Sequence, residues 1–294
     1  MKAAPFQYSR PATVDEACAL LAADDGARAI AGGQTLVPMM AMRLARPTRL
    51  VDIARIAALS HITKENGAIA IGAATRQCVI ERDGLIAAKL PLMARAVPNI
   101  GHAATRARGT LGGSLAHADP AAELPLVAVT LDARVLYRAG KESGEMPAGE
   151  FFIGPTITAL PAGALLTGVR FPVWTGKVGV GFHEVNARRS DFAFASAAAQ
   201  IELDEAGNAK RIAIGVGAVT DMPVRLDAAE QQLTGGTLDE KSVRAAVTEA
   251  LADIEALEDL HASAAYRRRA AASLAVRAIA DAKANAQGGS VHAH

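Results

Sequence analysis

Two glycine-rich segments carry the residues of this sequence that are best suited to chemistry. The first is Ala31-Gly32-Gly33-Gln34-Thr35-Leu36-Val37-Pro38, and the second begins Thr110-Leu111-Gly112-Gly113-Ser114 and runs to Pro120. Each places adjacent glycines beside a small hydroxyl or amide side chain, at a point where a strand is expected to end. Successive backbone N–H groups in such a turn can converge on an anion such as a diphosphate. Together the two segments predict a site for a phosphate-bearing cofactor.

Both segments also have a plainer interpretation. Paired glycines often serve only the left-handed backbone of a turn, and the second segment could be a polar surface loop ahead of a helix. The chain contains neither the G-x-G-x-x-G spacing of a dinucleotide fingerprint nor a G-x-x-x-x-G-K-[ST] motif. Glu123 follows the second segment, and its carboxylate could accept a hydrogen bond from a ribose or an amide group. Because both of these nucleotide-binding motifs are missing, a nucleotide would have to be bound by a fold other than those in which the motifs occur.

Other groups of reactive residues give weaker signals. Ser114, His117 and Asp119 have the types of a nucleophilic triad, but they share one short segment in which they could hardly align, and the chain has no G-x-S-x-G elbow. His183-Glu184 lacks the second histidine of a zinc-binding H-E-x-x-H motif. The stretch from Arg188 to Phe192 is either a solvated strand end with a salt bridge or a contact to a planar cofactor ring.

Composition limits the protein class. A chain of 294 residues favours two domains, and 51% hydrophobic with only 4% aromatic residues favours packed helices in an α/β or α+β enzyme. A formal charge of +1 argues against a nucleic-acid partner. Cys18 and Cys78 form no C-x-x-C motif and are expected to be reduced, buried thiols. No signal peptide and no apolar run long enough for a bilayer is visible, so we expect a soluble cytoplasmic protein without an integral membrane segment.

Helices and strands must position the two segments. A capping box at Thr13 predicts a helix to about Asp24. Further helices are expected at residues 36–45, from Thr75 toward Asp83, at 85–97, and from Pro120 through Leu131. Strands are expected at residues 28–31, 50–53, 68–72, 134–137, 151–152 and 165–171.

Residues 172–179 break the periodicity and predict a connector between two domains. Beyond it, three strands are expected at 181–185, 194–203 and 211–219, with a hairpin turn at 204–208. Three helices follow, at about 226–233, 239–253 and 264–284. The last residues, 287–294, are expected to be a disordered tail.

The two segments occur together with several other recognisable stretches. These are Met39-Met40 and Arg43-Leu44-Ala45-Arg46-Pro47; Leu50-Val51-Asp52-Ile53; Ile100-Gly101-His102; Arg106 to Pro125; Arg188-Arg189-Ser190-Asp191-Phe192-Ala193; and Tyr266-Arg267-Arg268. With them, nearly the whole chain resembles the flavin-binding medium subunit of the molybdenum hydroxylases, the family of carbon monoxide dehydrogenase and xanthine dehydrogenase. The resemblance implies a two-part FAD-binding domain of the PCMH type, here residues 1–175. It also implies a small C-terminal α+β domain with a three-stranded antiparallel sheet, here residues 176–286.

The resemblance also implies which residues bind the cofactor. The diphosphate and ribityl parts of FAD would be held by Ala31, Gly32, Gly33, Gln34, Thr35, Leu36, Thr110, Gly112, Gly113 and Ser114, with Asp119 close by. Glu123 occupies the position of an acidic residue on the adenosine side, while Ile100, Gly101, Leu165 and Leu166 would lie along the cofactor. Phe192 stands where some members have a tyrosine near the isoalloxazine ring, and Glu184 stands near a lysine of others. A glutamate close to the ring would lower the flavin potential.

The function implied by the resemblance is electron transfer. FAD would accept electrons from the [2Fe–2S] clusters of a small partner subunit and pass them to NAD, oxygen or a quinone. Substrate would be hydroxylated on a large molybdopterin subunit, in a dimer of heterotrimers, and no acid or base on this chain would be required. Two alternatives stay open at this point. One is a stand-alone FAD-dependent oxidoreductase of the same fold, and the other is a non-catalytic assembly subunit.

Overall fold

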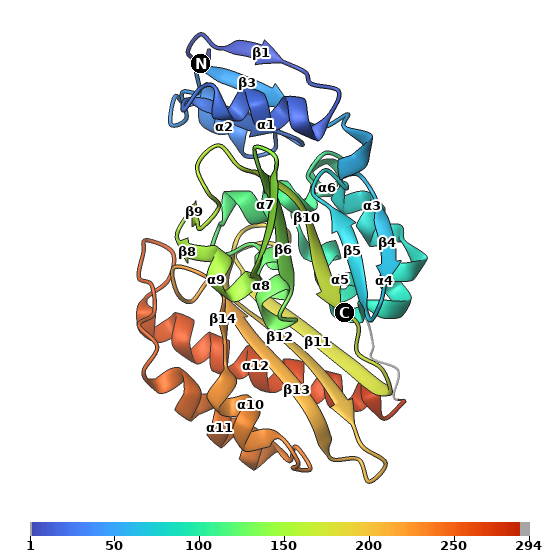
Figure 1. Ribbon diagram of the computed structural model, residues 1–294. Helices are drawn as coiled ribbons and strands as arrows, with labels where there is room; N and C mark the ends of the chain where they lie inside the picture. The colour runs from blue at the N-terminus through green and yellow to red at the C-terminus, as the bar shows by residue number, and fades with distance from the viewer. Residues whose placement is uncertain (1, 289–294) are drawn as a thin grey trace.

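The N-terminal part of the chain forms a small parallel sheet with strand order β1-β3-β2. The computed structural model describes residues 2–288, and this sheet lies at one end of the molecule (Figure 1). Its elements are β1 (Gln7–Ser9), α1 (Val14–Ala22), β2 (Ala27–Ile30), α2 (Leu36–Ala41) and β3 (Arg49–Asp52). Ala17, Cys18 and Leu21 of α1 are buried in one apolar cluster with Val51 of β3. This spacing places one face of α1 on the sheet.

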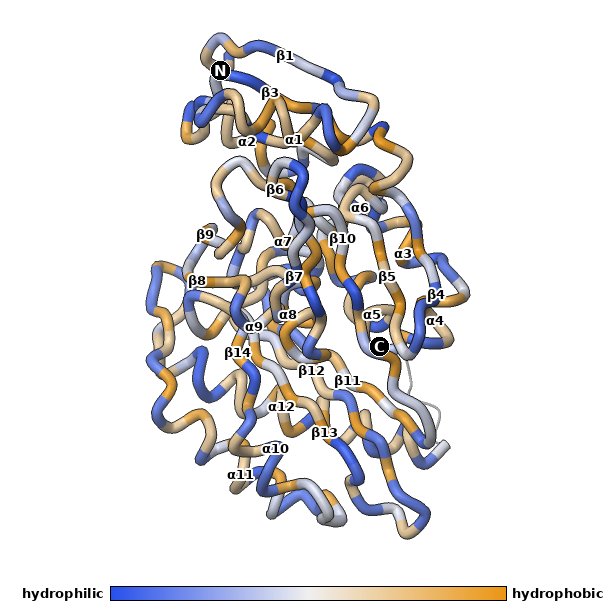
Figure 2. The backbone as a smooth tube through the Cα atoms, in the orientation of Figure 1, coloured by the Kyte–Doolittle hydropathy of each residue, from blue (hydrophilic) through white to orange (hydrophobic). Residues whose placement is uncertain are grey.

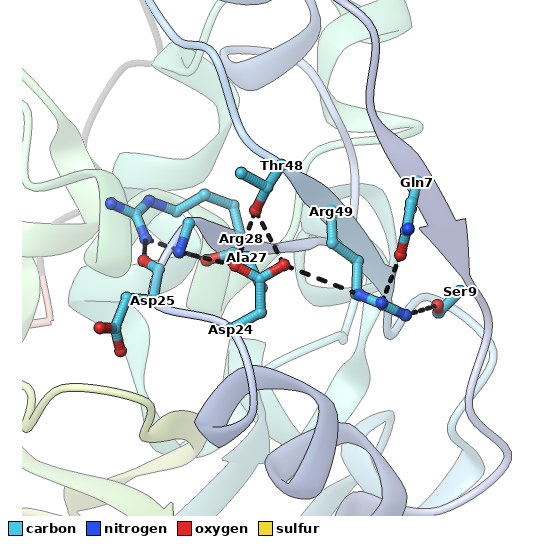
Figure 3. A network of polar contacts seen from close by, with 9 residues as sticks. Gln7, Ser9, Asp24, Asp25, Ala27, Arg28, Thr48 and Arg49 are labelled. Atoms are coloured by element: carbon cyan, nitrogen blue, oxygen red, sulfur yellow. Dashed lines mark hydrogen bonds and ion pairs between the residues drawn. The ribbon is translucent and has the colours of Figure 1, made fainter.

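Side-chain hydrogen bonds hold these short elements in register. Thr13 caps α1 by accepting a hydrogen bond from the Glu16 N–H at 3.2 Å, as the sequence predicts. In the network of Figure 3, the Thr48 hydroxyl donates to Asp24 at 2.8 Å, and Arg49 reaches Ser9 at 3.0 Å and Gln7. Asp24 precedes β2, whereas Thr48 directly precedes β3 and Arg49 begins it. The network therefore fixes the strand that leads into the first glycine segment.

The central sheet is antiparallel and has the order β4-β5-β10-β6-β7. Its strands are β4 (Ile62–Glu65), β5 (Ala68–Gly72), β6 (Arg134–Ala139), β7 (Glu142–Pro147) and β10 (Leu165–Pro172). β5 is fully buried, and Figure 2 shows apolar residues along β5 and hydrophilic ones along the edge strand β4. The sequence predicted the inner strands, whereas it missed β4 and β7, whose residues are mostly polar and exposed.

Short helices cover the central sheet. They are η1 (Ala57–Leu59), α3 (Gln77–Arg82), α4 (Gly84–Lys89), α5 (Pro91–Ala96), η2 (Val97–Asn99), α6 (Ala103–Arg106), α7 (Leu111–His117), α8 (Glu123–Thr130) and α9 (Ala148–Phe151), followed by the pair β8 (Phe152–Gly154) and β9 (Ile157–Thr158). The single helix expected at 85–97 is two helices, because Pro91 lacks the N–H needed to continue α4. Thr75 does not cap a helix, since its hydroxyl bonds to the backbone of His61.

The C-terminal part is a second antiparallel sheet, in the order β11-β12-β13-β14, with helices packed on it. Its elements are β11 (Lys177–Asn186), β12 (Ala193–Leu203), β13 (Ala209–Gly217), β14 (Val224–Arg225), α10 (Asp227–Leu233), α11 (Glu240–Ala252) and α12 (Ala264–Ala286). The three long strands are those predicted, and β14 adds two residues at one edge. β11 starts at Lys177, so the connector expected at 172–179 is only 173–176.

Alternating residues of β11 face opposite sides of this sheet. A Cβ on Gly179 or Gly181 would collide with the backbone of α12, so glycine lets this helix lie directly on the strand. Val180 and Phe182 point the other way, into the same apolar core as α8. Within residues 2–288 no helix is long and apolar enough to cross a bilayer. Of the predicted tail, Gln287 is the C-cap of α12 and Gly288 forms a turn with it, and residues 289–294 lie outside the described residues.

Candidate cofactor site

The two glycine segments, far apart in sequence, meet in the structure. A Cβ on Gly32 would collide with the Arg108 carbonyl group and lie 2.9 Å from Cα of Gly109. Residues 108 and 109 directly precede Thr110, the residue that begins the second segment. Glycine at position 32 is therefore what allows the loop after β2 to touch the start of the second segment. The prediction that the two segments belong to one site depends on this contact.

The first segment presents a run of backbone donors. Among residues 2–288, no protein group accepts a hydrogen bond from the N–H groups of Gly32 through Leu36. Gly33 has a φ of +70°, which turns the chain between β2 and α2. Gln34 and Thr35 are exposed, and the Gln34 side chain bonds back to the Gly32 carbonyl at 3.3 Å. Consecutive unpaired N–H groups at such a turn suit an anionic group.

The second segment differs from the sequence-based expectation, because its N–H groups are already paired. Leu111 and Gly112 donate to the carbonyls of Thr75 and Ala73 at 3.0 Å and 2.8 Å, and Gly113 donates to the Thr110 hydroxyl at 3.1 Å. Thr110 is thus the N-cap of α7, and residues 111–117 are helical rather than a loop. A Cβ on Gly112 would lie 2.5 Å from that of Ala73. Glycine at position 112 therefore permits close packing against Ala73. The half-buried Ser114 presents a hydroxyl group that can form a hydrogen bond.

Arg106 organises the turn that contains Ile100 and Gly101. Its guanidinium donates to the carbonyls of both residues at 3.0 Å and to Glu81 at 2.9 Å and 3.0 Å. Gly101 has a φ of +44°. Nothing in the sequence indicated this role for Arg106, because its partners lie on a separate helix and a separate turn. The arginine fixes a segment that the resemblance places along the cofactor.

Leu165 and Leu166 lie at the start of β10, and both side chains are buried. Leu165 belongs to the apolar cluster of the N-terminal sheet, whereas Leu166 belongs to that of the central sheet. The strand bulges between Leu166 and Gly168, next to the Thr167 carbonyl that accepts the Ala73 N–H at 2.9 Å. These two leucines therefore join the two cores, and a contact to a cofactor from here would involve the backbone.

Glu123 and Glu184 come from different parts of the chain and lie close enough to interact. Glu123 is the first residue of α8, and burial raises its pKa to about 7, with a further contribution from Asp119. Glu184 lies in β11, where burial and then the Glu123 charge raise its pKa to about 8. Asp119 instead accepts the Ala121 N–H at 2.8 Å and shapes the turn before α8. The sequence did not indicate that the charge of Glu123 would act on Glu184.

Phe192 lies at the rim of this region and is 74% exposed. It belongs to the loop between β11 and β12, in which Ser190 has a φ of +73°. Arg189 and Ser190 of this loop line a surface pocket together with Gly101 and Arg106. The Arg188 and Asp191 side chains approach to 3.8 Å, which matches the salt bridge of the plainer interpretation. The loop thus faces the Ile100–Gly101 turn, and both interpretations of it remain compatible with this placement.

Comparisons with known proteins agree with this architecture. Residues 4–174 match the family described as FAD binding domain in molybdopterin dehydrogenase, and residues 181–282 match the CO dehydrogenase flavoprotein C-terminal domain. The sequence is 36% identical over 283 residues to the 6-hydroxypseudooxynicotine dehydrogenase complex subunit alpha of Paenarthrobacter nicotinovorans, covering 96% of each chain.

Two solved structures show the same fold over nearly the full length. Carbon monoxide dehydrogenase from Hydrogenophaga pseudoflava gives a TM-score of 0.94 at 32% identity, covering 97% of this chain and 99% of that one. Quinoline 2-oxidoreductase from Pseudomonas putida 86 gives a TM-score of 0.92 at 34% identity, with 98% and 99% covered.

Proposed function

The chain belongs to the FAD-binding medium subunits of the molybdenum hydroxylase family, and from this premise we propose that it is the exit end of an electron chain in a multi-subunit oxidoreductase. FAD is the cofactor of this family. When bound, it would supply the redox chemistry between the [2Fe–2S] clusters of a small subunit and an acceptor such as NAD, oxygen or a quinone. Substrate would be hydroxylated on a large molybdopterin subunit, in a cytoplasmic dimer of heterotrimers.

The observation that carries this proposal is the first glycine segment. Its N–H groups from Gly32 through Leu36 have no acceptor among residues 2–288, and hydrogen bonds to a charged acceptor are among the stronger ones in proteins. We propose that this segment binds the FAD diphosphate, with Thr110 and Ser114 beside it. The remaining proposed cofactor residues are Ala31, Gly112, Gly113, Ile100, Gly101, Asp119, Glu123, Leu165, Leu166, Glu184 and Phe192.

We also propose a division into an FAD-binding domain of residues 1–175 and a C-terminal domain of residues 176–286. It is supported by the two family matches, which stop at residue 174 and resume at residue 181. The connector 173–176 is anchored by Trp174, whose ring lies 3.9 Å from the Arg211 guanidinium of β13. Such a cation–π contact fixes the connector on the C-terminal sheet.

The experiment is a titration of the purified, flavin-free chain with FAD, FMN and riboflavin, followed by flavin fluorescence, after the ligand released by heating has been identified by mass. We expect FAD to bind at near-equal molar ratio and riboflavin to bind far more weakly, because riboflavin lacks the diphosphate. A chain that takes up no flavin would refute the proposal and leave an assembly role. Equal affinity for FAD and riboflavin would refute the assignment of the diphosphate to the first segment.

A second experiment tests the dependence on partners. The FAD-loaded chain alone should not reduce an electron acceptor when an aldehyde, a purine or an N-heterocycle is added, because in the proposed complex the substrate is hydroxylated on the large subunit. The same mixture should become active when the co-expressed complex replaces the isolated chain. Turnover by the isolated chain would favour the stand-alone oxidoreductase.

A further inference from the structure

The segment between β5 and α3 runs alongside the start of the second glycine segment. An antiparallel bridge pairs Arg76 with Thr110. The backbone hydrogen bonds on either side of this bridge measure 3.0 Å, from the N–H of Leu111, and 2.9 Å, to the carbonyl of Gly109. The backbone beside Arg76 therefore holds residues 109–111 in a fixed place.

The Arg76 side chain extends this hold to the two residues before Gly109. Its Nη1 atom donates to the carbonyls of Ala107 at 3.0 Å and of Arg108 at 3.3 Å. Among residues 2–288, no other protein group donates a hydrogen bond to either carbonyl. In the same part of the chain, no carboxylate lies within ion-pairing distance of the guanidinium. The half-buried Arg76 is therefore committed to the backbone of this turn and not to a salt bridge.

The Arg108 carbonyl that Arg76 holds is also the group against which Gly32 lies. A Cβ on Gly32 would collide with this carbonyl and would lie 2.9 Å from Cα of Gly109. The position of the Arg108 oxygen therefore limits how the first segment can approach the second. One carbonyl group thus connects the guanidinium of Arg76 with the loop after β2.

The side chain of Gln77, the next residue after Arg76, packs against the same turn without holding its carbonyls. A Cβ on Gly109 would collide with Oε1 of Gln77 and would lie 3.1 Å from the Thr105 carbonyl. The Gln77 side chain is buried, and its Oε1 atom has no hydrogen-bond partner among the described residues. This side chain restricts Gly109 by packing, so the hydrogen bonds that orient the two preceding carbonyls come from Arg76.

We propose that Arg76 is a positioning residue for the FAD diphosphate and that it acts on the first glycine segment through the Arg108 carbonyl. The inference rests on the proposed binding of the diphosphate by that segment. The N–H groups from Gly32 through Leu36 can converge on an anion only while the loop keeps its course against this carbonyl. Without the guanidinium, the carbonyl loses its protein donor and turns toward water, so the contact with Gly32 is no longer fixed.

The test measures the Kd for FAD and for riboflavin in the flavin-free full chain and in its variants, by flavin fluorescence. Arg76→Gln should weaken binding of FAD about tenfold or more, because donors of the first segment lose their alignment. Binding of riboflavin, which has no diphosphate, should weaken far less. Arg76→Lys keeps the charge but replaces the planar fork with a single ammonium, so its Kd for FAD should lie between those of the parent and Arg76→Gln. The control Arg82→Gln, which changes the exposed last residue of α3, should keep the parent Kd.

A double-mutant cycle tests whether Arg76 and Gly32 act on the same contact. Gly32→Ala pushes the Arg108 carbonyl away, and Arg76→Gln releases it, so the second change should add little to the first. The double variant should bind FAD within about threefold of the weaker-binding single variant. As a control, Gly181→Ala disturbs a contact with α12 in the C-terminal part, and its effect on Tm should add to that of Arg76→Gln.

Three results would overturn the inference while leaving the proposed function intact. They are a parent-like Kd for FAD in Arg76→Gln, an equal loss of affinity for FAD and riboflavin, and single-variant effects on the Kd for FAD that multiply in the double variant. If Arg76→Gln fails to fold, Arg76→Lys decides, since a positioning role requires it to lose more affinity for FAD than for riboflavin. If the parent chain binds no FAD, the proposed function itself fails.

Discussion

The contact between the two glycine segments can be tested by adding one methyl group, in the variant Gly32→Ala. The new Cβ would collide with the Arg108 carbonyl and lie 2.9 Å from Cα of Gly109. Both neighbours are backbone atoms, so no side-chain rotation can relieve the contact. One of the two loops must move away from the other.

The expected change in the free energy of unfolding combines two opposing effects. Inserting a methyl group into a well-packed region costs about 1–3 kcal/mol. Gly32 does not have a positive φ, so alanine can adopt its backbone conformation and regains about 0.4–1 kcal/mol by restricting the unfolded chain. The net loss of about 1–2 kcal/mol corresponds to a decrease in Tm of about 2–4 °C for each kcal/mol in a chain of this size.

Cofactor affinity should fall as well. The five N–H donors from Gly32 through Leu36 belong to the loop that must shift. Loss of one hydrogen bond to a charged group costs about 1.5–3 kcal/mol, and each 1.4 kcal/mol is a factor of about ten in Kd. We therefore expect FAD to bind about tenfold more weakly, or worse. Thermal unfolding of the flavin-free chain and fluorescence titration with FAD measure the two effects separately.

The matched control is Gly84→Ala. Gly84 is exposed at the start of α4, its φ is not positive, and an added Cβ would meet nothing within 4 Å. This variant should keep the FAD affinity and should unfold at the same temperature or slightly higher. If Gly32→Ala matched Gly84→Ala in both measurements, the close approach of the two segments would be wrong.

Three further predictions concern the C-terminal part. Gly181→Ala should lower the Tm by several degrees, since its Cβ would collide with the α12 backbone; an unchanged Tm would contradict the direct packing of β11 on this helix. Arg267→Ala should cost about 1–3 kcal/mol in chemical denaturation, because it removes the hydrogen bonds to the Phe194 and Ala218 carbonyls and the ion pair with Asp259, whereas the exposed Arg269→Ala on the same helix should cost little. Two backbone N–H groups and then Arg267 hold the pKa of Asp259 at about 2, so its contribution to stability is present above the usual value of 3.8 and is lost as pH falls toward 2. In Asp259→Asn, the Tm should fall less over this acidic range than in the parent chain. An unchanged dependence of Tm on pH would exclude Asp259 as a source of the acid destabilisation.

The sequence predicted the elements whose signals are local. The cap at Thr13, the buried runs of β5 and β10 and the three long strands of the second sheet can each be identified from a few consecutive residues, because propensity, capping and apolar patterning act over one or two turns. Elements with mainly polar residues, such as β4 and β7, gave no such signal. Their pairing is decided by the buried strands beside them.

The cofactor family could also be recognised from sequence, since the two glycine segments are contiguous motifs. The role of each glycine could not be recognised from the sequence. Gly32 and Gly112 both appeared to expose donors to an anion, yet the donors after Gly112 bond within the protein, and the glycine itself accommodates Ala73. The backbone partners of a loop lie on distant parts of the chain, so hydrogen-bond availability follows only from the folded structure.

The sequence by itself therefore identified the family and its cofactor, and it predicted which residues would form the site. The tertiary structure alone decided how those residues interact: that the N–H groups of the first segment have no acceptor among residues 2–288, and that Arg106 fixes the Ile100–Gly101 turn. The physical reason is that residue type and local periodicity are properties of neighbours in sequence. Burial, charge repulsion and close backbone contact depend on segments that become neighbours only when the sheets pack.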